Sequence, residues 1–197
     1  MDLVQSAPMG PGIVQNLGES LLSAADLIDR VPRASLAAAT PCADWDVFGV
    51  INHLAAVTEK FGRFAAGSTG LIRQLGGDLV GDEPARSFRR IVGRALEAWR
   101  DHPEVLETVC ILPFGRFDGA TAAGINLFDA VVHQWDIAAG ADLDHAVNDD
   151  LSAVALPVAR LLVTDEARRS DHYGAPVAPG PDALPSARLL ALVGRRG

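Results

Sequence analysis

Three polar side chains interrupt an otherwise apolar stretch of the sequence, NLFDAVVHQWDIAAG, at residues 126–140. Asp129, His133 and Asp136 stand among leucine, phenylalanine, alanine, valine, tryptophan and isoleucine, a composition typical of a helix buried against other elements. Residues four apart lie on one face of an α-helix, so Asp129 and His133 can reach a single ion. Asp136 follows three residues later and stays close to that face.

A divalent metal ion would explain why a core helix carries a carboxylate. An unpaired carboxylate in an apolar core is costly, and it either shifts its pKa or binds a cation. His53, which we expect on the apolar face of another helix, could supply a third ligand from across a helical bundle. Two imidazoles and one carboxylate leave a coordination position open for water or a substrate.

The alternative is that these side chains form ordinary buried hydrogen bonds without a metal. A histidine on an apolar helical face is more often a hydrogen-bonded core residue than a ligand. For Asp136 we favour this interpretation, because a carboxylate beside Trp135 near a helix end can accept from a backbone or side-chain donor. Asp136 therefore stays the weaker candidate ligand.

Hydrophobic periodicity predicts the helices that would position these residues. The expected helices span residues 12–30, 46–66, 83 or 84 to 101, and 120–139. Asp44 or Asp46 is the expected N-cap of the helix that carries His53. Gly140 is the expected stop of the helix that carries Asp129 and His133.

The rest of the chain is less regular. A fifth helix at 149–164 is expected after the N-cap Asn148, and Pro157 should kink or interrupt it. Residues 102–121 fit a loop or a brief strand, and the tail from about 170 to 197 is rich in proline and glycine except for SARLLALVG, a short docking helix. We therefore predict one all-α domain over residues 1–197, an antiparallel helical bundle with long connections.

The composition excludes several classes of protein. The 197 residues are 49% hydrophobic and 21% charged with a net charge of -8, which argues against a nucleic-acid-binding protein. Two distant cysteines make neither a disulfide framework nor a zinc ribbon. No secretory leader or membrane-spanning apolar run is evident, so we expect a cytoplasmic protein that does not bind membranes.

Two motifs resemble a known family when they are taken together: TPCADWDVFGVINHLAAV at residues 40–57 and VVHQWDIAAG at 131–140. With the tail at 173–195, they are similar to actinobacterial relatives of the mycothiol-dependent maleylpyruvate isomerase metal-binding domain. That domain falls within the DinB/YfiT-like superfamily, and the resemblance extends over nearly the whole chain.

The resemblance implies an antiparallel four-helix bundle of the DinB type that binds a divalent metal, zinc or alternatively nickel. By position, the family's metal ligands correspond to His53, Asp129 and His133, the trio that the spacing also suggests. The isomerase has glutamate where this chain has Asp129, so a metal would bind more weakly or lie closer to that helix. The isomerase also carries a further C-terminal domain, for which 197 residues leave no room, and this argues against the isomerase reaction itself.

Two classes of function remain open at this stage. The first is a thiol-dependent transferase or isomerase that uses a bacterial thiol such as mycothiol and acts on a small electrophile, with Trp45, Asp46 and Asp136 around its substrate pocket. The second is a non-catalytic metal- or ligand-binding bundle, as a monomer or a homodimer. Chelation should destabilise either one, whereas a metal-free hydrogen-bond cluster would lose little.

The remaining cysteine, histidine and tryptophan residues suggest structural roles. Cys42 lies just before a helix, where a thiol pKa is lowered, but a turn or packing role is the favoured interpretation. Cys110 is expected in the core. The other notable side chains are predicted to pack in the core (Trp99, Trp135) or to lie on the surface (His102, His145, His172).

Overall fold

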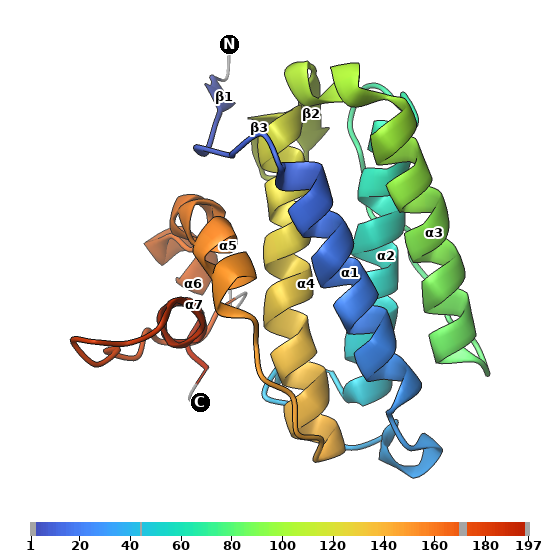
Figure 1. Ribbon diagram of the computed structural model, residues 1–197, viewed down its shortest axis with the longest axis vertical. Helices are drawn as coiled ribbons and strands as arrows, with labels where there is room; N and C mark the ends of the chain where they lie inside the picture. The colour runs from blue at the N-terminus through green and yellow to red at the C-terminus, as the bar shows by residue number, and fades with distance from the viewer. Residues whose placement is uncertain (1–2, 44, 170–172, 196–197) are drawn as a thin grey trace.

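The computed structural model describes residues 3–43, 45–169 and 173–195. It is mostly helical, as predicted, with one small sheet at one end (Figure 1). Helix α1 packs against α3 and α4, and α2 packs against the same two helices from the other side. The four long helices are α1 (Ile13–Asp29), α2 (Val47–Ala65), α3 (Pro84–Asp101) and α4 (Gly119–Ala141).

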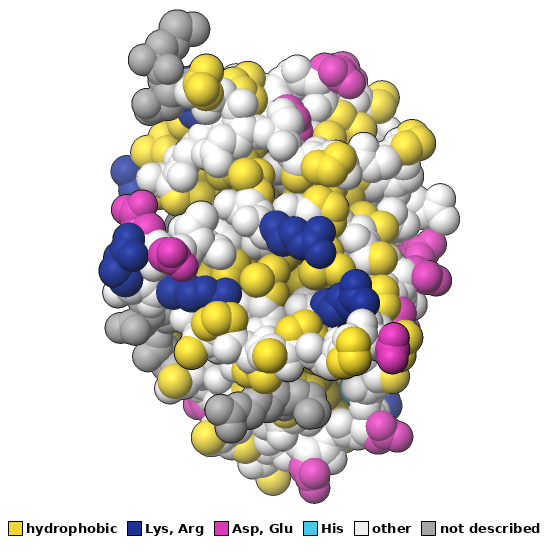
Figure 2. Space-filling view, turned by 90° about the vertical axis from the view of Figure 1, so that its left-hand side faces the viewer, with side chains coloured by type: hydrophobic (Ala, Val, Ile, Leu, Met, Phe, Trp, Pro, Cys, Tyr) yellow, Lys and Arg dark blue, Asp and Glu magenta, His cyan; other side chains and the backbone are white. Residues whose placement is uncertain are grey.

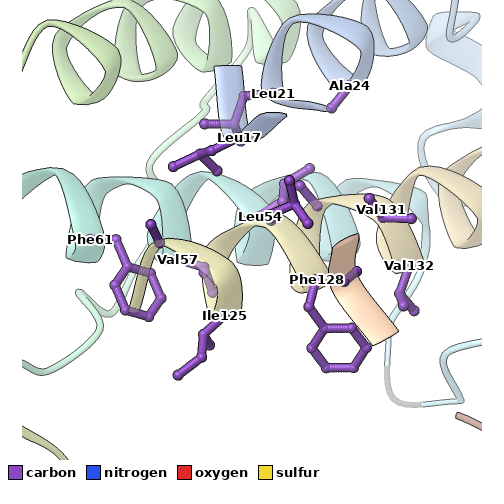
Figure 3. Packing of buried hydrophobic residues seen from close by; sticks show 14 of the residues in the cluster. Leu17, Leu21, Ala24, Leu54, Val57, Phe61, Ile125, Phe128, Val131 and Val132 are labelled. Atoms are coloured by element: carbon purple, nitrogen blue, oxygen red, sulfur yellow. The ribbon is translucent and has the colours of Figure 1, made fainter. Parts of the chain in front are cut away.

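Apolar residues at three- and four-residue intervals form the core between these helices. Leu17 and Leu21 of α1 point toward α2 and α4, where Leu54 and Phe61 lie fully buried (Figure 3). Burying one such side chain contributes about 1.5–3 kcal/mol. The core therefore holds α2 and α4 in a fixed relation, which is the condition for a site shared between them.

Side-chain caps fix where the site-bearing helices begin. Asp46 accepts from the Gly49 amide at 2.8 Å and caps α2, as one of the two predicted candidates; the other, Asp44, lies outside the described residues. Asp118 caps α4 by accepting from the Thr121 amide at 2.6 Å.

The C-terminal end of α4 corrects a prediction. Gly140 was expected to stop the helix, but α4 continues to Ala141, and Asp142 takes the left-handed conformation with φ 53°. Gly140 has a packing role instead, because a Cβ there would lie 2.8 Å from Val47 Cγ2 and 2.9 Å from Thr40 Cγ2. Glycine thus lets the loop before α2 approach α4 closely.

The sheet was only partly foreseen. Strands β2 (Val109–Leu112) and β3 (Gly115–Asp118) form an antiparallel hairpin within the segment predicted as loop or brief strand. Strand β1 (Val4–Gln5) pairs with β3 in parallel, so the strand order is β1-β3-β2. The short 3₁₀ helix η2 (Pro103–Glu107) joins α3 to this sheet.

The C-terminal part of the chain folds back on α4. Helix α5 (Asp149–Leu162) packs against α4 and begins at Asn148 as predicted, but Pro157 does not interrupt it. Proline removes only one backbone donor, and packing on two sides holds the helix together. The predicted docking helix appears as α7 (Pro185–Leu192) on α5, and the short helices η1 (Arg33–Ser35) and α6 (Asp165–Arg169) complete the chain.

The surface around α5–α7 mixes basic and hydrophobic side chains near its middle, with acidic ones mainly toward its edges (Figure 2). Within the described residues, no helix combines the length and apolar character needed to span a membrane.

Candidate metal centre

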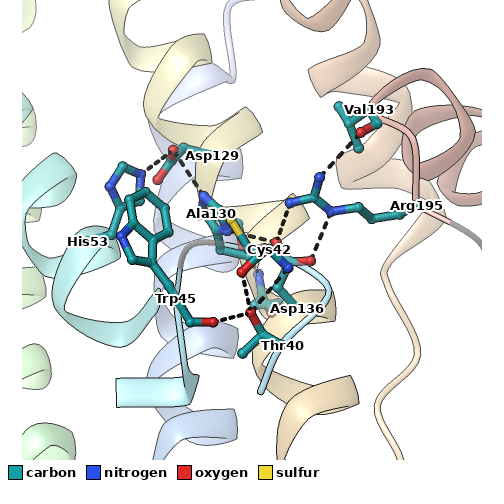
Figure 4. A network of polar contacts seen from close by, with 11 residues as sticks. Thr40, Cys42, Trp45, His53, Asp129, Ala130, Asp136, Val193 and Arg195 are labelled. Atoms are coloured by element: carbon teal, nitrogen blue, oxygen red, sulfur yellow. Dashed lines mark hydrogen bonds and ion pairs between the residues drawn. The ribbon is translucent and has the colours of Figure 1, made fainter. Parts of the chain in front are cut away.

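His53 is held in place by the loop that precedes α2. Thr40 Oγ1 donates to the Trp45 carbonyl at 2.7 Å and accepts from the Cys42 amide at 3.1 Å, which closes the turn of the TPCADW motif. The Trp45 indole stacks on the His53 ring with centroids 4.4 Å apart and planes inclined by 27° (Figure 4). The motif therefore fixes the orientation of the His53 imidazole, and Cys42 has the turn role that we favoured.

Asp129 and His133 reach the same point from α4. Asp129 Oδ1 lies 3.2 Å from His53 Nε2 and 3.6 Å from His133 Nε2. One ligand atom from each of the three residues lies within 4.8 Å of the other two. The structure thus brings the three predicted ligand residues together between α2 and α4, in an arrangement that could hold a metal ion.

One oxygen of Asp129 supports this fit. Asp129 Oδ2 is fully buried, and no hydrogen-bond donor among the described residues reaches it. Leaving such an atom unpaired costs free energy, since nearly all buried carboxylate oxygens have a partner. A cation beside the carboxylate would compensate for that cost, and two imidazole nitrogens with one carboxylate suit zinc or another divalent transition metal.

The charges around the trio are strongly coupled. Burial raises the pKa of Asp129, but the charges of His53 and His133 lower it, and the net shift is downward. Burial lowers the pKa of His133, whereas Asp129 and Asp136 raise it, and the net shift is upward. Without a metal, the carboxylate and the imidazolium stabilise one another.

A second carboxylate stands behind His133. Asp136 is fully buried and accepts from His133 Nδ1 at 2.9 Å, which leaves Nε2 facing Asp129. The same carboxylate accepts from Arg195 Nε and Nη2, each at 2.9 Å (Figure 4). Asp136 therefore has the side-chain donors that we expected, and it orients a candidate ligand while lying behind it.

The contact between Gln74 and His53 depends on the tautomer of His53. Gln74 Nε2 lies 3.3 Å from His53 Nδ1, which suits an Nδ1 acceptor and an Nε2–H donating to Asp129. A metal on Nε2 requires the proton on Nδ1, and a half-turn of the Gln74 amide would then present its oxygen as the acceptor.

Sequence reasoning missed Arg195 and Gln74 and placed Asp46 too close to the site. Asp46 is exposed and serves as the cap of α2, whereas Trp45 does cover His53. Arg195 comes from beyond α7, and no periodic pattern links it to α4. The remaining histidines lie elsewhere: His102 is exposed beside Glu104, His145 is half-buried, and His172 falls outside the described residues.

The cysteine and tryptophan predictions for the core hold in part. Cys110 and Trp99 are buried, whereas Trp135 is only partly buried on α4. Cys42 is partly buried and lies beside Arg195, whose pKa it helps to raise.

Fold and site together define a mostly helical protein with a His–Asp–His cluster between two packed helices. The sequence profile of the mycothiol maleylpyruvate isomerase N-terminal domain matches residues 18–138, more than half of the chain, so the protein belongs to that family. The match includes all three residues of the cluster and ends before Arg195.

The chain is also similar to uncharacterised proteins from two strains of Mycobacterium tuberculosis, CDC 1551 / Oshkosh and ATCC 25618 / H37Rv. Each is 27% identical over 177 residues, which cover 87% of this chain and 91% of the relative. No solved structure matches the chain.

Proposed function

We propose that this protein is a divalent-metal-binding bundle of the DinB type in which His53, Asp129 and His133 hold the ion. The observation that carries the proposal is Asp129, which lies between two imidazoles and has a buried oxygen without a donor among the described residues. Zinc is the metal that we expect, with nickel as the alternative.

We further propose that the site serves a thiol-dependent transferase or isomerase acting on a small electrophile, with mycothiol or a similar thiol as cosubstrate. Membership in the mycothiol maleylpyruvate isomerase N-terminal domain family supports this choice. A bound divalent ion would lower the pKa of a thiol in its open position and supply a nucleophile at neutral pH.

The chain's own residues would prepare that position. Asp136 keeps a proton on His133 Nδ1, so that Nε2 can serve as a ligand. The Trp45 indole covers one side of His53 and excludes water from it. The side chains of His53 and His133 are only 18% and 10% exposed, so that only a small ligand could reach the proposed metal.

The remaining aspects of the proposal concern the context of the site. We propose a single domain over residues 1–197, because α5 packs on α4 and Arg195 of the tail contacts the site. A cytoplasmic location fits two cysteines that form no disulfide, Cys42 and Cys110, and a low-molecular-weight thiol cosubstrate. The net charge of -8 supports a small-molecule partner over a nucleic acid.

Metal analysis of the purified, untagged protein tests the first proposal. We expect near one equivalent of zinc or nickel in the wild type and loss of the metal in His133→Ala. His102→Ala is the matched control, because His102 is exposed and far from the cluster in sequence. Absence of metal after incubation with zinc and nickel salts would instead support the hydrogen-bond cluster.

Activity separates the enzyme from the non-catalytic bundle. The metal-loaded protein is mixed with mycothiol and a panel of small electrophiles, and both the loss of free thiol and the conversion of the electrophile are followed over time. A transferase consumes the thiol, whereas an isomerase converts the electrophile and releases the thiol again. Turnover that disappears in His133→Ala and persists in His102→Ala supports the enzyme. A stoichiometric metal with no turnover of any thiol and electrophile pair supports the metal- or ligand-binding bundle.

A further inference from the structure

Helices α1 and α3 form an exposed face of the bundle with an apolar groove between them. In Figure 1 the two helices lie side by side at the front, and none of the described elements is drawn over them. The groove has a volume of about 610 Å³, and its walls are mainly apolar, with Val14, Leu22 and Leu96 among them. Leu22 is 50% exposed, although it lies in the middle of α1. An apolar surface with an exposed leucine is typical of an interaction site.

The two helices that line the groove carry opposite charges. Helix α1 contains three acidic residues and no basic one, whereas α3 contains five arginines and two acidic residues. Arg89 of α3 uses its charge within the chain, because it pairs with Asp26 and Asp29 of α1. Glu19 on the α1 side and Arg100 on the α3 side are exposed in the groove, and neither forms an ion pair within the described part of the chain.

This charge pattern indicates which molecule fits the face. A partner must present a basic element to α1 and an acidic element to α3, on either side of an apolar centre. A second copy of the chain has both elements on the same face, as an isologous interface requires. A two-fold axis parallel to the helices places α1 of each copy on α3 of the other, whereas an axis across the helices would place acidic α1 on acidic α1.

The direction of the helices determines which residues would meet. Arg89 near the start of α3 pairs with Asp29 at the end of α1, and a Cβ at Gly18 near the start of α1 would lie 3.7 Å from Leu96 Cδ2. The two helices are therefore antiparallel, with Gly18 and Leu96 at the same level. A two-fold rotation about an axis parallel to the helices keeps every residue at its level. Leu22, four residues after Gly18, thus meets the level four residues before Leu96.

We propose that the groove between α1 and α3 is the interface of a symmetric homodimer. Leu22 of each copy packs against the α3 wall of the other copy, and Glu19 of each copy pairs with Arg100 of the partner subunit. These two residues are about 8 Å apart along the helix axis, which two long side chains can span. The proposal involves none of the His–Asp–His cluster and does not depend on whether a metal binds.

The size of the face predicts a weak dimer. Helices of 17 and 18 residues are about 26 Å long, and two neighbouring helices are about 20 Å wide. The contact is therefore about 500 Å² per copy, at the low end of the range for specific interfaces. We expect a reversible dimer with a dissociation constant in the micromolar range.

Sedimentation velocity of the full chain, from micromolar to near-millimolar concentration, tests the interface. The wild type should shift from monomer to dimer, and Leu22→Glu should raise the dissociation constant at least tenfold, because it places a charge at the apolar centre. Leu184→Glu is the matched control, since Leu184 is 60% exposed and lies outside the groove. It should leave the dissociation constant unchanged.

Charge reversal tests the reciprocal pairing. Glu19→Arg and Arg100→Glu each bring like charges together in a dimer of identical copies, so each variant alone should dimerise at least tenfold more weakly. In an equal mixture, one copy carries two basic groups at these positions and the other carries two acidic groups. The mixture should therefore dimerise with near wild-type affinity, and native mass spectrometry identifies the mixed dimer because the two variants differ in mass.

The possible outcomes are distinct. A monomer at every concentration overturns the proposal and leaves the groove for an unrelated partner. A dimer that Leu22→Glu does not weaken has its interface elsewhere and also overturns it. Circular dichroism verifies that the variants fold, and absence of the mixed dimer from two folded variants overturns the arrangement of α1 on α3. Restored dimerisation in the mixture supports it, because no interface elsewhere on the chain would respond to this pair of substitutions.

Discussion

Replacing Asp136 by asparagine should weaken both the fold and the candidate metal site. Asp136 is fully buried and accepts three hydrogen bonds of 2.9 Å, two from Arg195 and one from His133. Removing one partner of a buried ion pair typically costs 3–5 kcal/mol, because the other charge stays buried. Asparagine keeps the shape and one acceptor, and the Arg195 side chain is 10% exposed, so we expect about 3 kcal/mol.

The same substitution should lower metal affinity. Carboxylates that hold a ligating histidine commonly contribute about 10–100-fold to metal binding. Without the negative charge, the proton on His133 Nδ1 is less firmly fixed and the imidazole is a weaker ligand. We therefore expect about a tenfold or greater rise in the zinc dissociation constant of Asp136→Asn.

Two assays measure these effects separately. Urea denaturation of the metal-free protein, followed by circular dichroism, gives the free energy of unfolding, and competition with a chromogenic chelator gives the zinc affinity. Asp26→Asn is the matched control, since it removes a carboxylate paired with an exposed arginine and should change neither quantity appreciably.

A double-mutant cycle of Asp136→Asn and Arg195→Met measures the interaction free energy between these two side chains. The double variant should be destabilised by less than the sum of the two single substitutions, because neither Asp136 nor Arg195 then leaves the other as an unpaired buried charge. Unchanged zinc affinity in Asp136→Asn, together with reduced stability, would show that Asp136 only anchors the tail. The argument that it orients His133 would then be wrong.

Three further predictions follow from the packing and the pKa shifts. Gly140→Ala should destabilise the protein by about 1–3 kcal/mol in urea denaturation, because its Cβ would meet Val47 Cγ2 at 2.8 Å. Gly93→Ala is the control and should stabilise the protein slightly, because a Cβ at Gly93 would have no atom within 4 Å. Equal effects of the two substitutions would contradict the packing argument. Burial raises the pKa of the Cys110 thiol to about 12, so iodoacetamide at pH 8 should leave Cys110 unmodified until the protein unfolds, and modification in the folded state would refute this. The pKa of His133 is raised above 6.5, so its contribution to the stability of the metal-free protein is fully present below that pH and lost as pH rises through the folded pKa. Urea midpoints in EDTA should therefore fall from pH 6 to pH 9 in the wild type and less so in His133→Ala, and parallel curves would contradict the shift.

The helices and the shared helical face of Asp129 and His133 could be predicted because both depend on local sequence. Apolar residues at three- and four-residue intervals indicated α1–α4, and the spacing of Asp129 and His133 put both on one helical face. His53 was the less determined member, since its approach to α4 depends on how two helices pack. The resemblance to the family supplied that tertiary information.

The features that escaped prediction depend on contacts between distant segments. Strands β1 and β3 pair although more than a hundred residues separate them, since Val4 lies opposite Arg116. Strand β1 has only two residues, which is too short for a hydrophobic periodicity to be detected. A glycine near the end of a helix is typical of a C-terminal cap, so the sequence predicts that role for Gly140. Its packing role becomes evident only from the close approach of the loop before α2. Nothing in the sequence distinguishes Arg195 from the other fifteen arginines. Its role is evident only from the folded structure, in which the tail brings it to Asp136 of α4.

The contact between Arg195 and Asp136 couples the tail to the candidate metal site. Any interaction that holds Arg195 on Asp136 also fixes the tautomer of His133 and strengthens its role as a ligand. Linkage requires the reverse effect of equal size, so an ion bound by His133 must favour the docked tail. The family match ends at residue 138, so this contact links Asp136, which orients the candidate ligand His133, to a part of the chain that lies outside the matched domain.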